Sequence, residues 1–380
     1  MDIGDGDLET VMELADFDVN KLDQFALAAS SNVWSTPQLR PHQQEAIRFI
    51  MHPCKPNNVI INHRTGSGKT HIVRVVGVCE RAITLIFIPL LTLSADVMQK
   101  FTCANDTWGT VEVQHLDELY EANRSKYTTF LQRCRSMQRS TTSTTFVFLS
   151  PQFLVNHQDA LAVFLHCAAE RTLRLVVEDE AHLKVQHGMS FRGEIRQLRT
   201  IFYRKVFDPM NRRNWPKTIF LTGTLPTDYI ADLTTLTTIP FPPECILRGS
   251  RESFSQREIM IRQTVTNKGD FVKKGLAEVV QHLIDHPDDS VVVFCNSRTK
   301  SLHYLKLLEH KLNASHCGTD CIHIHGALHR MDKFMRIKLF CEARGMELND
   351  MDFRCLLTTN GTSTLECLKN HPIRPIYLVV

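Results

Sequence analysis

Short runs of apolar residues alternate along the chain with longer segments in which apolar residues recur at helical spacing. Five apolar runs occur in the first part of the chain, at residues 57–62, 82–89, 144–150, 173–179 and 217–223. Continuous runs of this length, separated by helix-sized segments, are typical of buried parallel strands in βαβ units. The first part of the chain is therefore predicted to form a parallel sheet covered by helices.

A second alternating set follows a break at residues 241–256, which is rich in proline and serine and shows no helical period. Further strands are expected at 290–296, 321–326 and 353–359. We predict an α/β protein with two parallel-sheet lobes, at 34–240 and 257–380. Residues 241–256 would be the linker between the lobes, and residues 1–33 would be an acidic extension.

The net charge of +3 is unevenly distributed along the sequence. Residues 1–25 contain eight acidic residues and one lysine, so the remaining residues carry +10. Residues 121–143 are basic and polar, which indicates a surface helix ending in a Ser/Thr loop. A basic body favours a polyanionic partner.

Twelve cysteines are scattered singly along the chain, several inside apolar stretches. This pattern is typical of reduced thiols in a nuclear or cytosolic protein. No apolar run approaches the roughly 18 residues of a membrane span. The acidic first residues also lack the basic start and apolar centre of a secretory signal. We expect a protein of the nucleus, or of the cytoplasm in a prokaryote, that is not secreted and has no membrane partner.

A strand, a glycine-containing loop and a helix follow one another at residues 57–79, and the loop reads HRTGSGKT. Gly66 and Gly68 allow backbone N–H groups to curve around phosphate oxygens at the helix N-terminus. Lys69 supplies a positive charge for the β- and γ-phosphates, and Thr70 offers a hydroxyl to Mg²⁺. The alternative is a glycine–serine surface turn, which the flanking strand and helix disfavour. The predicted ATP-binding residues of the loop are Thr65, Gly66, Ser67, Gly68, Lys69 and Thr70.

The segment LRLVVEDEAH is an apolar strand that ends in carboxylates. A carboxylate at the tip of a parallel strand lies at the phosphate crevice, where Asp179 would hold Mg²⁺ and Glu180 would polarise the attacking water. A solvated acidic turn is the alternative. Lys69, Asp179 and Glu180 are the predicted catalytic residues, and Thr70 and Asp179 the predicted Mg²⁺ ligands.

Two further segments contain candidate functional residues. The strand KTIFLTGTLP ends in Thr222 and Thr224, which together with His182 are predicted to couple the nucleotide state to the second lobe. In LRPHQ, the Gln43 amide suits bidentate contacts with adenine, and Arg40 suits stacking or phosphate pairing. Each of these segments taken alone also fits an ordinary strand exit or helix start.

In order, the chain shows LRPHQ, HRTGSGKT, IPLLTLSADVMQKF, FLSPQFL, EDEAHLKVQHGMSFRGEIRQL, LTGTLP, VVVFCNSRTKS and HIHGALHRMDK. This succession resembles the superfamily 2 helicases, and most closely the RecQ family of DNA helicases. The resemblance covers about residues 34–360. Its most specific part is the aromatic-rich loop after the DEAH box, matched by Gln186, Gly188, Phe191, Arg192 and Glu194.

The resemblance implies two RecA-like lobes of the P-loop NTPase type that use ATP and Mg²⁺ for 3′–5′ translocation on DNA. The implied partners are single-stranded and partly duplex DNA, and the implied processes are DNA repair and recombination. The residues expected to bind DNA are Gln186, Phe191, Arg192, Asn296 and Arg298.

The chain also departs from the family pattern. His187 stands at a usual tryptophan, Ser35 at a usual glycine, and residues 358–380 lack a clear Gly-x-Asp motif. The chain ends at Val380, before the sixth motif with its arginine fingers. The second lobe is therefore expected to be incomplete, with ATP and DNA binding but slow hydrolysis. A catalytically impaired relic and an RNA-directed DEAH helicase remain as alternatives.

A cluster of histidines and cysteines near residue 320 has enough ligands for Zn²⁺. Its members are His316, Cys317, Cys321, His323 and His325. A turn leading into a strand explains the same residues, and we predict no structural zinc there.

Overall fold

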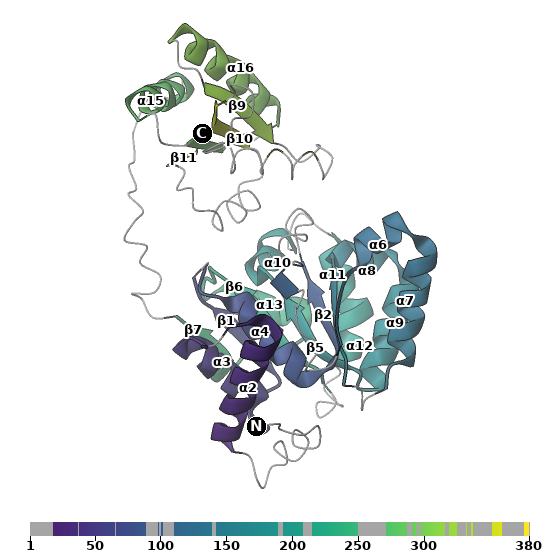
Figure 1. Ribbon diagram of the computed structural model, residues 1–380. Coiled ribbons are helices and arrows are strands. Elements are labelled where there is room, and N and C mark those ends of the chain that lie inside the picture. Colours follow the sequence, from purple (N-terminus) through teal and green to yellow (C-terminus); the bar gives the residue numbers. More distant parts are fainter. Residues whose placement is uncertain are drawn as a thin grey trace. The chain divides into compact units, whose positions relative to one another are not determined.

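The computed structural model divides into two compact units, Met1–Gln256 and Arg257–Val380, each described here by itself (Figure 1). The structure describes residues 18–36, 38–64, 66–88, 98, 100–101, 110–138, 142–188, 193–207, 215–249, 271–286, 291–294, 298–315, 319–324, 332, 336, 352–358 and 376–379.

A seven-stranded parallel sheet forms the centre of the first unit, with the strand order β3-β4-β2-β5-β6-β1-β7. The strands are β1 (Asn58–Asn62), β2 (Ala82–Phe87), β3 (Val111–His115), β4 (Thr144–Leu149), β5 (Leu173–Glu178), β6 (Lys217–Thr222) and β7 (Ile246–Arg248). Because every pair is parallel, all carboxyl ends lie along one edge. The loops after β1, β5 and β6 therefore come together at neighbouring positions. The predicted α/β fold is confirmed.

Helices cover both faces of this sheet (Figure 1). They are α2 (Val19–Trp34), α3 (Pro41–Met51), α4 (Lys69–Glu80), α6 (Leu116–Ala122), α7 (Arg124–Ser136), α8 (Pro151–Asn156), α9 (Gln158–Ala169), α10 (Ala181–Gly188), α11 (Gly193–Leu198), the π-helix η2 (Arg199–Tyr203), α12 (Arg204–Val206), α13 (Tyr229–Thr237) and the 3₁₀-helix η4 (Pro243–Cys245). Successive strand residues face opposite sides. Ile60 accordingly joins the core under α7 to α13, whereas Val59 and Ile61 join the core under α2 to α4.

Side-chain caps begin several of these helices. Asp18 accepts a hydrogen bond from the Asn20 N–H, and Asn123 accepts one from the Lys126 N–H. Ser150 does the same for the Phe153 N–H at the start of α8. A short polar side chain at this position satisfies one of the N–H groups that a helix leaves unpaired, which typically contributes about 1 kcal/mol.

Two predicted boundaries differ from the structure. Half of the predicted extension forms α2, whose buried Leu22, Ala26 and Val33 pack into the core with α3 and α4. Six residues of the predicted linker form η4 and β7, and β7 pairs with β1 as an edge strand. The acidic residues before and within α2, and the prolines around η4, suggested an extension and a linker, whereas burial against distant residues shows that both segments belong to the first unit.

The strand β3 was not predicted. Its sequence, VEVQH, alternates polar and apolar residues, and four of its five residues are half-buried. As the edge strand beside β4, it needs no continuous apolar run.

The second unit contains a four-stranded parallel sheet in the order β11-β8-β10-β9. Its elements are α15 (Phe271–Asp285), β8 (Val291–Phe294), α16 (Arg298–Ala314), β9 (Thr319–Ile324), β10 (Asp352–Thr358) and β11 (Ile376–Val379). Leu276 and Leu283 from α15 pack with Val293 and with Leu308 from α16. Among the described residues of both units, no helix has the length and apolarity to cross a membrane.

Candidate functional site

The loops after β1, β5 and β6 meet at the carboxyl edge of the first sheet, and they contain most of the residues predicted to act. Asn62 and Thr222 are register partners at the ends of β1 and β6. The His63 N–H continues this pairing by donating to the Thr222 carbonyl at 3.2 Å. The sheet therefore brings the glycine loop and the LTGT segment together, although they are far apart in sequence.

Both glycines of the loop have left-handed backbone conformations. Gly66 has φ 78° and Gly68 has φ 86°, and Gly68 is the N-cap of α4. A Cβ added to Gly68 would lie 2.4 Å from the Gln43 Nε2, whereas one added to Gly66 would meet no atom within 4 Å. Gly68 is therefore required for two reasons, its φ angle and the close approach of α3.

Lys69 begins α4 and turns back over the loop. Its Nζ donates to the His63 carbonyl at 2.7 Å and to the Arg64 carbonyl at 3.1 Å. The Ser67 Oγ is buried, and no hydrogen-bond partner for it is found among the described residues. An ammonium group, an unpaired buried hydroxyl and a helix N-terminus form a cradle that fits a phosphate group. Thr70 follows in the first turn of α4.

The start of α3 holds this loop from the other side. The Arg40 Nη1 donates to the Gly66 and Ser67 carbonyls at 3.2 and 3.1 Å. The Gln43 Nε2 donates to the Gly68 carbonyl at 3.1 Å, and its Oε1 accepts from the Arg40 N–H at 2.8 Å. Arg40 and Gln43 thus hold the glycine-containing loop itself by hydrogen bonds, while their contact with adenine stays a prediction.

Two histidines stack at the start of the loop, and neither was predicted from the sequence to have a function. The rings of His42 and His63 have centroids 5.0 Å apart and planes tilted by 27°. A ring nitrogen of His42 lies 2.8 Å from the Ser67 carbonyl. Burial lowers the pKa of His63 to about 4, and His42 and Lys69 act in the same direction. His63 is therefore neutral near pH 7, so it adds no charge beside the phosphate cradle.

Asp179 and Glu180 lie directly after β5. The Asp179 N–H donates to the Phe87 carbonyl at 3.1 Å, and the Glu180 N–H donates to the Asp179 Oδ1 at 3.0 Å. Burial, and after it the Glu180 carboxylate, raise the pKa of Asp179 to about 7, while Lys69 acts in the opposite direction. A desolvated carboxylate with a second carboxylate beside it is stabilised by a hard divalent cation. The pair therefore fits Mg²⁺.

His182 joins the DEAH segment to the LTGT segment. Its Nδ1 lies 3.2 Å from the Glu180 Oε2 and 3.1 Å from the Thr222 Oγ1. The Thr222 Oγ1 in turn donates to the Thr224 carbonyl at 2.9 Å. The three residues predicted to couple nucleotide state to motion thus form one contact chain that begins at Glu180.

Several predicted residues lie outside the described part of the chain: Thr65, Phe191, Arg192 and Asn296. For Gln186 in α10 and Arg298 in α16 the structure describes the backbone position alone. In the histidine–cysteine cluster, a ring nitrogen of His323 lies 2.9 Å from the Ser301 Oγ. His316, Cys317 and His325 lie outside the described residues.

Residues 40–233, about half of the chain, match the family described as DEAD/DEAH box helicase. The chain belongs to the DEAD/DEAH box helicase family. The matched range includes the glycine loop, the DEAH box and the LTGT segment. Membership implies, in general, a helicase or ATPase that uses ATP with Mg²⁺ and binds nucleic acid.

Solved structures of helicases share the fold at low sequence identity. The DEAD-box helicase Mss116 bound to ssRNA and UDP-BeF is 15% identical with a TM-score of 0.59, covering 93% of this chain and 66% of that one. S. cerevisiae Dbp5 bound to RNA and ADP BeF3 is 13% identical with a TM-score of 0.55, covering 95% and 88%. The Mycobacterium smegmatis helicase Lhr bound to ssDNA and AMP-PNP is 14% identical with a TM-score of 0.54, covering 91% and 42%. This likeness confirms the RecA-like helicase fold. No curated protein sequence matches the chain.

The two glycines of the loop allow a graded test of the phosphate cradle. Gly66→Ala should weaken ATP binding through its φ angle alone, at about 1–2 kcal/mol for the left-handed conformation. Gly68→Ala should weaken it further, by about tenfold or more, because its Cβ also displaces Gln43. Titration with a fluorescent ATP analogue compares the two variants. Equal affinities would contradict the role of the Gln43 contact.

Proposed function

We propose that the chain is an ATP-dependent DNA helicase of the RecQ type that translocates 3′ to 5′ on single-stranded DNA. The observation that supports this proposal most directly is that Lys69, the Asp179–Glu180 pair and Thr222 lie together at one edge of the sheet. Lys69 lies close enough to Asp179 to oppose the rise in its pKa. A phosphate-binding cation, a metal-binding carboxylate and a second carboxylate are thereby brought together, as phosphoryl transfer requires.

Bound Mg·ATP would supply the phosphoryl group, and each residue has a distinct role toward it. The N–H groups from Gly66 to Lys69 bind the phosphates, and the Lys69 ammonium neutralises their charge. Asp179 and Thr70 would hold Mg²⁺, which would neutralise charge on the phosphates. Glu180 orients the attacking water and accepts its proton. A displacement of Glu180 during turnover would be transmitted to Thr222 through its contact with His182.

The choice of DNA over RNA rests on the sequence after the DEAH box. Gln186, Gly188, Phe191, Arg192 and Glu194 match the aromatic-rich loop of RecQ helicases. Aromatic and guanidinium planes stack with bases with little sequence preference. A motor of this kind would serve DNA repair and recombination, in the nucleus or, in a prokaryote, in the cytoplasm.

The test compares ATP hydrolysis stimulated by single-stranded DNA with that stimulated by RNA of the same sequence. We expect stronger stimulation by DNA than by RNA. Stronger stimulation by RNA would overturn the DNA assignment in favour of an RNA-directed helicase. Nucleotide and DNA binding without any hydrolysis would identify a catalytically impaired relic.

Binding of single-stranded DNA should depend on salt because the body of the chain carries +10. Each phosphate that loses its counterion contributes about −0.7 to the slope of log K against log salt concentration. Fluorescence anisotropy of a labelled oligonucleotide at several salt concentrations measures this slope. A flat response would show that backbone phosphates do not contribute to the binding.

A further inference from the structure

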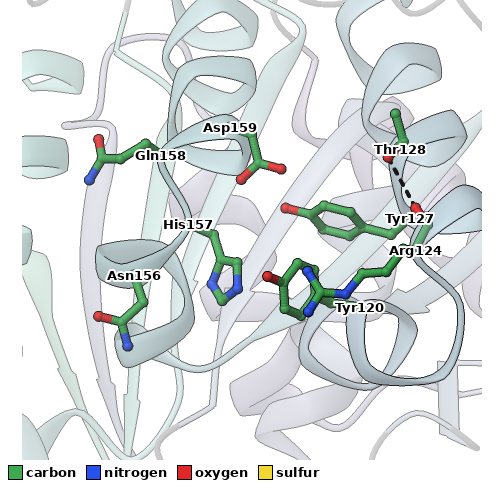
Figure 2. A pocket seen from close by; sticks show the side chains of 8 residues that line it. All are labelled: Tyr120, Arg124, Tyr127, Thr128, Asn156, His157, Gln158 and Asp159. Atoms are coloured by element: carbon green, nitrogen blue, oxygen red, sulfur yellow. Dashed lines mark hydrogen bonds between the residues drawn. The ribbon is translucent and has the colours of Figure 1, made fainter.

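A pocket of about 510 Å³ opens on the first unit, away from the phosphate loop (Figure 2). Its walls come from the end of α6, the first turn of α7, and the junction of α8 with α9. These helices follow β3 and β4, so they leave the sheet at the same carboxyl edge as the phosphate loop but from its other end. A volume of this size falls in the range of small-ligand sites.

One side of the pocket consists of stacked planar groups. The guanidinium carbon of Arg124 lies 3.1 Å from the centre of the Tyr120 ring. His157 meets Tyr120 edge-on at 4.2 Å and stacks on Phe153 at 3.9 Å. A ring nitrogen of His157 lies 2.8 Å from the Phe153 carbonyl, which fixes the ring. Such fixed aromatic and guanidinium planes are the surfaces on which unpaired nucleobases stack.

The other side of the pocket is polar. Tyr127 is 2% exposed, and its hydroxyl has no hydrogen-bond partner of ordinary geometry among the described residues. In Figure 2 this hydroxyl points toward the Asp159 carboxylate. Burial, with Asp159 adding to it, raises the pKa of Tyr127, so the hydroxyl stays protonated. The pocket therefore offers an exposed carboxylate with two acceptor oxygens, and the Tyr127 hydroxyl beside it is buried.

The charge of α7 favours a polyanion as the larger ligand. Its basic residues are Arg124, Lys126, Arg133 and Arg135, and the helix contains no acidic residue. Arg133 forms an ion pair with Glu112 of β3. Arg124 and Lys126 are exposed next to the pocket. Phosphates of a strand that enters the pocket would meet these two cations.

We propose that this pocket binds one unstacked guanine base of a nucleic-acid strand, an inference that rests on the nucleic-acid binding proposed above. Guanine is the base whose Watson–Crick edge presents two adjacent donors, N1–H and N2–H, and these match the two oxygens of Asp159. The ring stacks on the Arg124 and Tyr120 side.

The test uses twelve-nucleotide thymidine strands that contain one central guanosine, inosine or thymidine. Inosine keeps N1–H and O6 but lacks the 2-amino group, so it removes one of the two donors to Asp159. The wild-type protein should bind the guanosine strand about tenfold more tightly than the thymidine strand, with inosine between them. Asp159→Asn should abolish this preference, so that the guanosine and thymidine strands bind equally. Glu170→Gln, an exposed acid-to-amide change at the other end of α9, should retain it.

A second pair of variants separates stacking from charge. Arg124→Ala and Lys126→Ala each remove one exposed positive charge from the first turn of α7. Both variants should bind every strand more weakly, and to the same extent, because each loses one contact with a backbone phosphate. Arg124→Ala alone should lose about a further tenfold in affinity for the guanosine strand. Equal losses for the two variants would overturn the stacking role.

The outcomes distinguish this proposal from the function on which it rests. Nucleic-acid binding without a guanosine preference would overturn the guanine pocket and leave the helicase proposal intact. Failure of the wild-type protein to bind any strand would overturn both. An arginine-containing peptide that binds the wild-type protein but not Asp159→Asn, with strand binding unchanged, would assign the pocket to a protein partner and overturn the nucleobase proposal.

Discussion

Lys184→Met is expected to lower the free energy of unfolding of the first unit by about 3–5 kcal/mol. The Lys184 Nζ donates to the Glu178 Oε1 at 2.6 Å and to the Tyr203 hydroxyl at 2.7 Å. The side chains of Lys184 and Glu178 are only 5% and 3% exposed. Removal of one partner leaves a buried charge without compensation, and this is the costly way to disrupt a buried pair.

The pKa directions agree with this expectation. Burial raises the pKa of Glu178 and lowers that of Lys184, and in each case the opposite charge of the partner resists the change. Without Lys184, Glu178 would take up a proton in the fold. Glu178, directly before the DEAH box, would then lose both the ion pair and the hydrogen bond that Lys184 provides.

Urea denaturation followed by tryptophan fluorescence measures the effect, because all three tryptophans of the chain belong to the first unit. Arg48→Met is the control, since Arg48 pairs with Asp23 at the surface and an exposed pair contributes at most about 1 kcal/mol. Glu178→Leu combined with Lys184→Met should recover most of the stability, because buried pairs can be replaced by apolar residues. A loss below about 1 kcal/mol for Lys184→Met alone would contradict the argument.

Lys69→Ala is expected to lower the affinity for Mg·ATP by about 10- to 100-fold. A charge-assisted hydrogen bond contributes about 1.5–3 kcal/mol, which corresponds to this range. In the structure the Lys69 ammonium spans the loop between the His63 and Arg64 carbonyls, at the position where phosphate oxygens would enter. Titration with a fluorescent ATP analogue measures the change.

Lys21→Ala removes the same charge from an exposed position on α2 and should leave the affinity unchanged. Thermal unfolding of Lys69→Ala is needed as well, because Lys69 also ties together two carbonyls of the loop. A folded Lys69→Ala protein that binds ATP as tightly as the wild type would remove the phosphate-loop assignment.

The parallel strands and the order of the motifs could be predicted from the sequence because both are local properties. Ile60 and Val176 lie in continuous apolar runs that suit buried strands, and the runs alternate with helix-sized segments. The glycines of HRTGSGKT, through their backbone freedom, and the carboxylates of DEAH, through their charge, indicate a phosphate site when they follow strands. Their meeting at one edge followed from the parallel pairing alone.

Tertiary structure decided the features that depend on residues far apart in sequence. Val33 of α2 lies in the core of the first unit and the partly buried Leu247 of β7 packs against it, because distant helices and strands cover them. The stacking of His42 on His63 exists because α3 lies against the loop after β1.

The buried Glu178–Lys184 pair and the pocket beside Tyr120 have the same origin. In sequence, Glu178 reads as one more acid of the DEAH segment, and Tyr120 and Asp159 lie 39 residues apart in two ordinary helices. Sequence periodicity reports which face of an element is buried, but not which element covers it. The sequence by itself thus determined the fold class and predicted the residues of the candidate phosphate site. The partners of its buried charges, and the side chains that share a pocket, were determined by how the helices pack on the sheet.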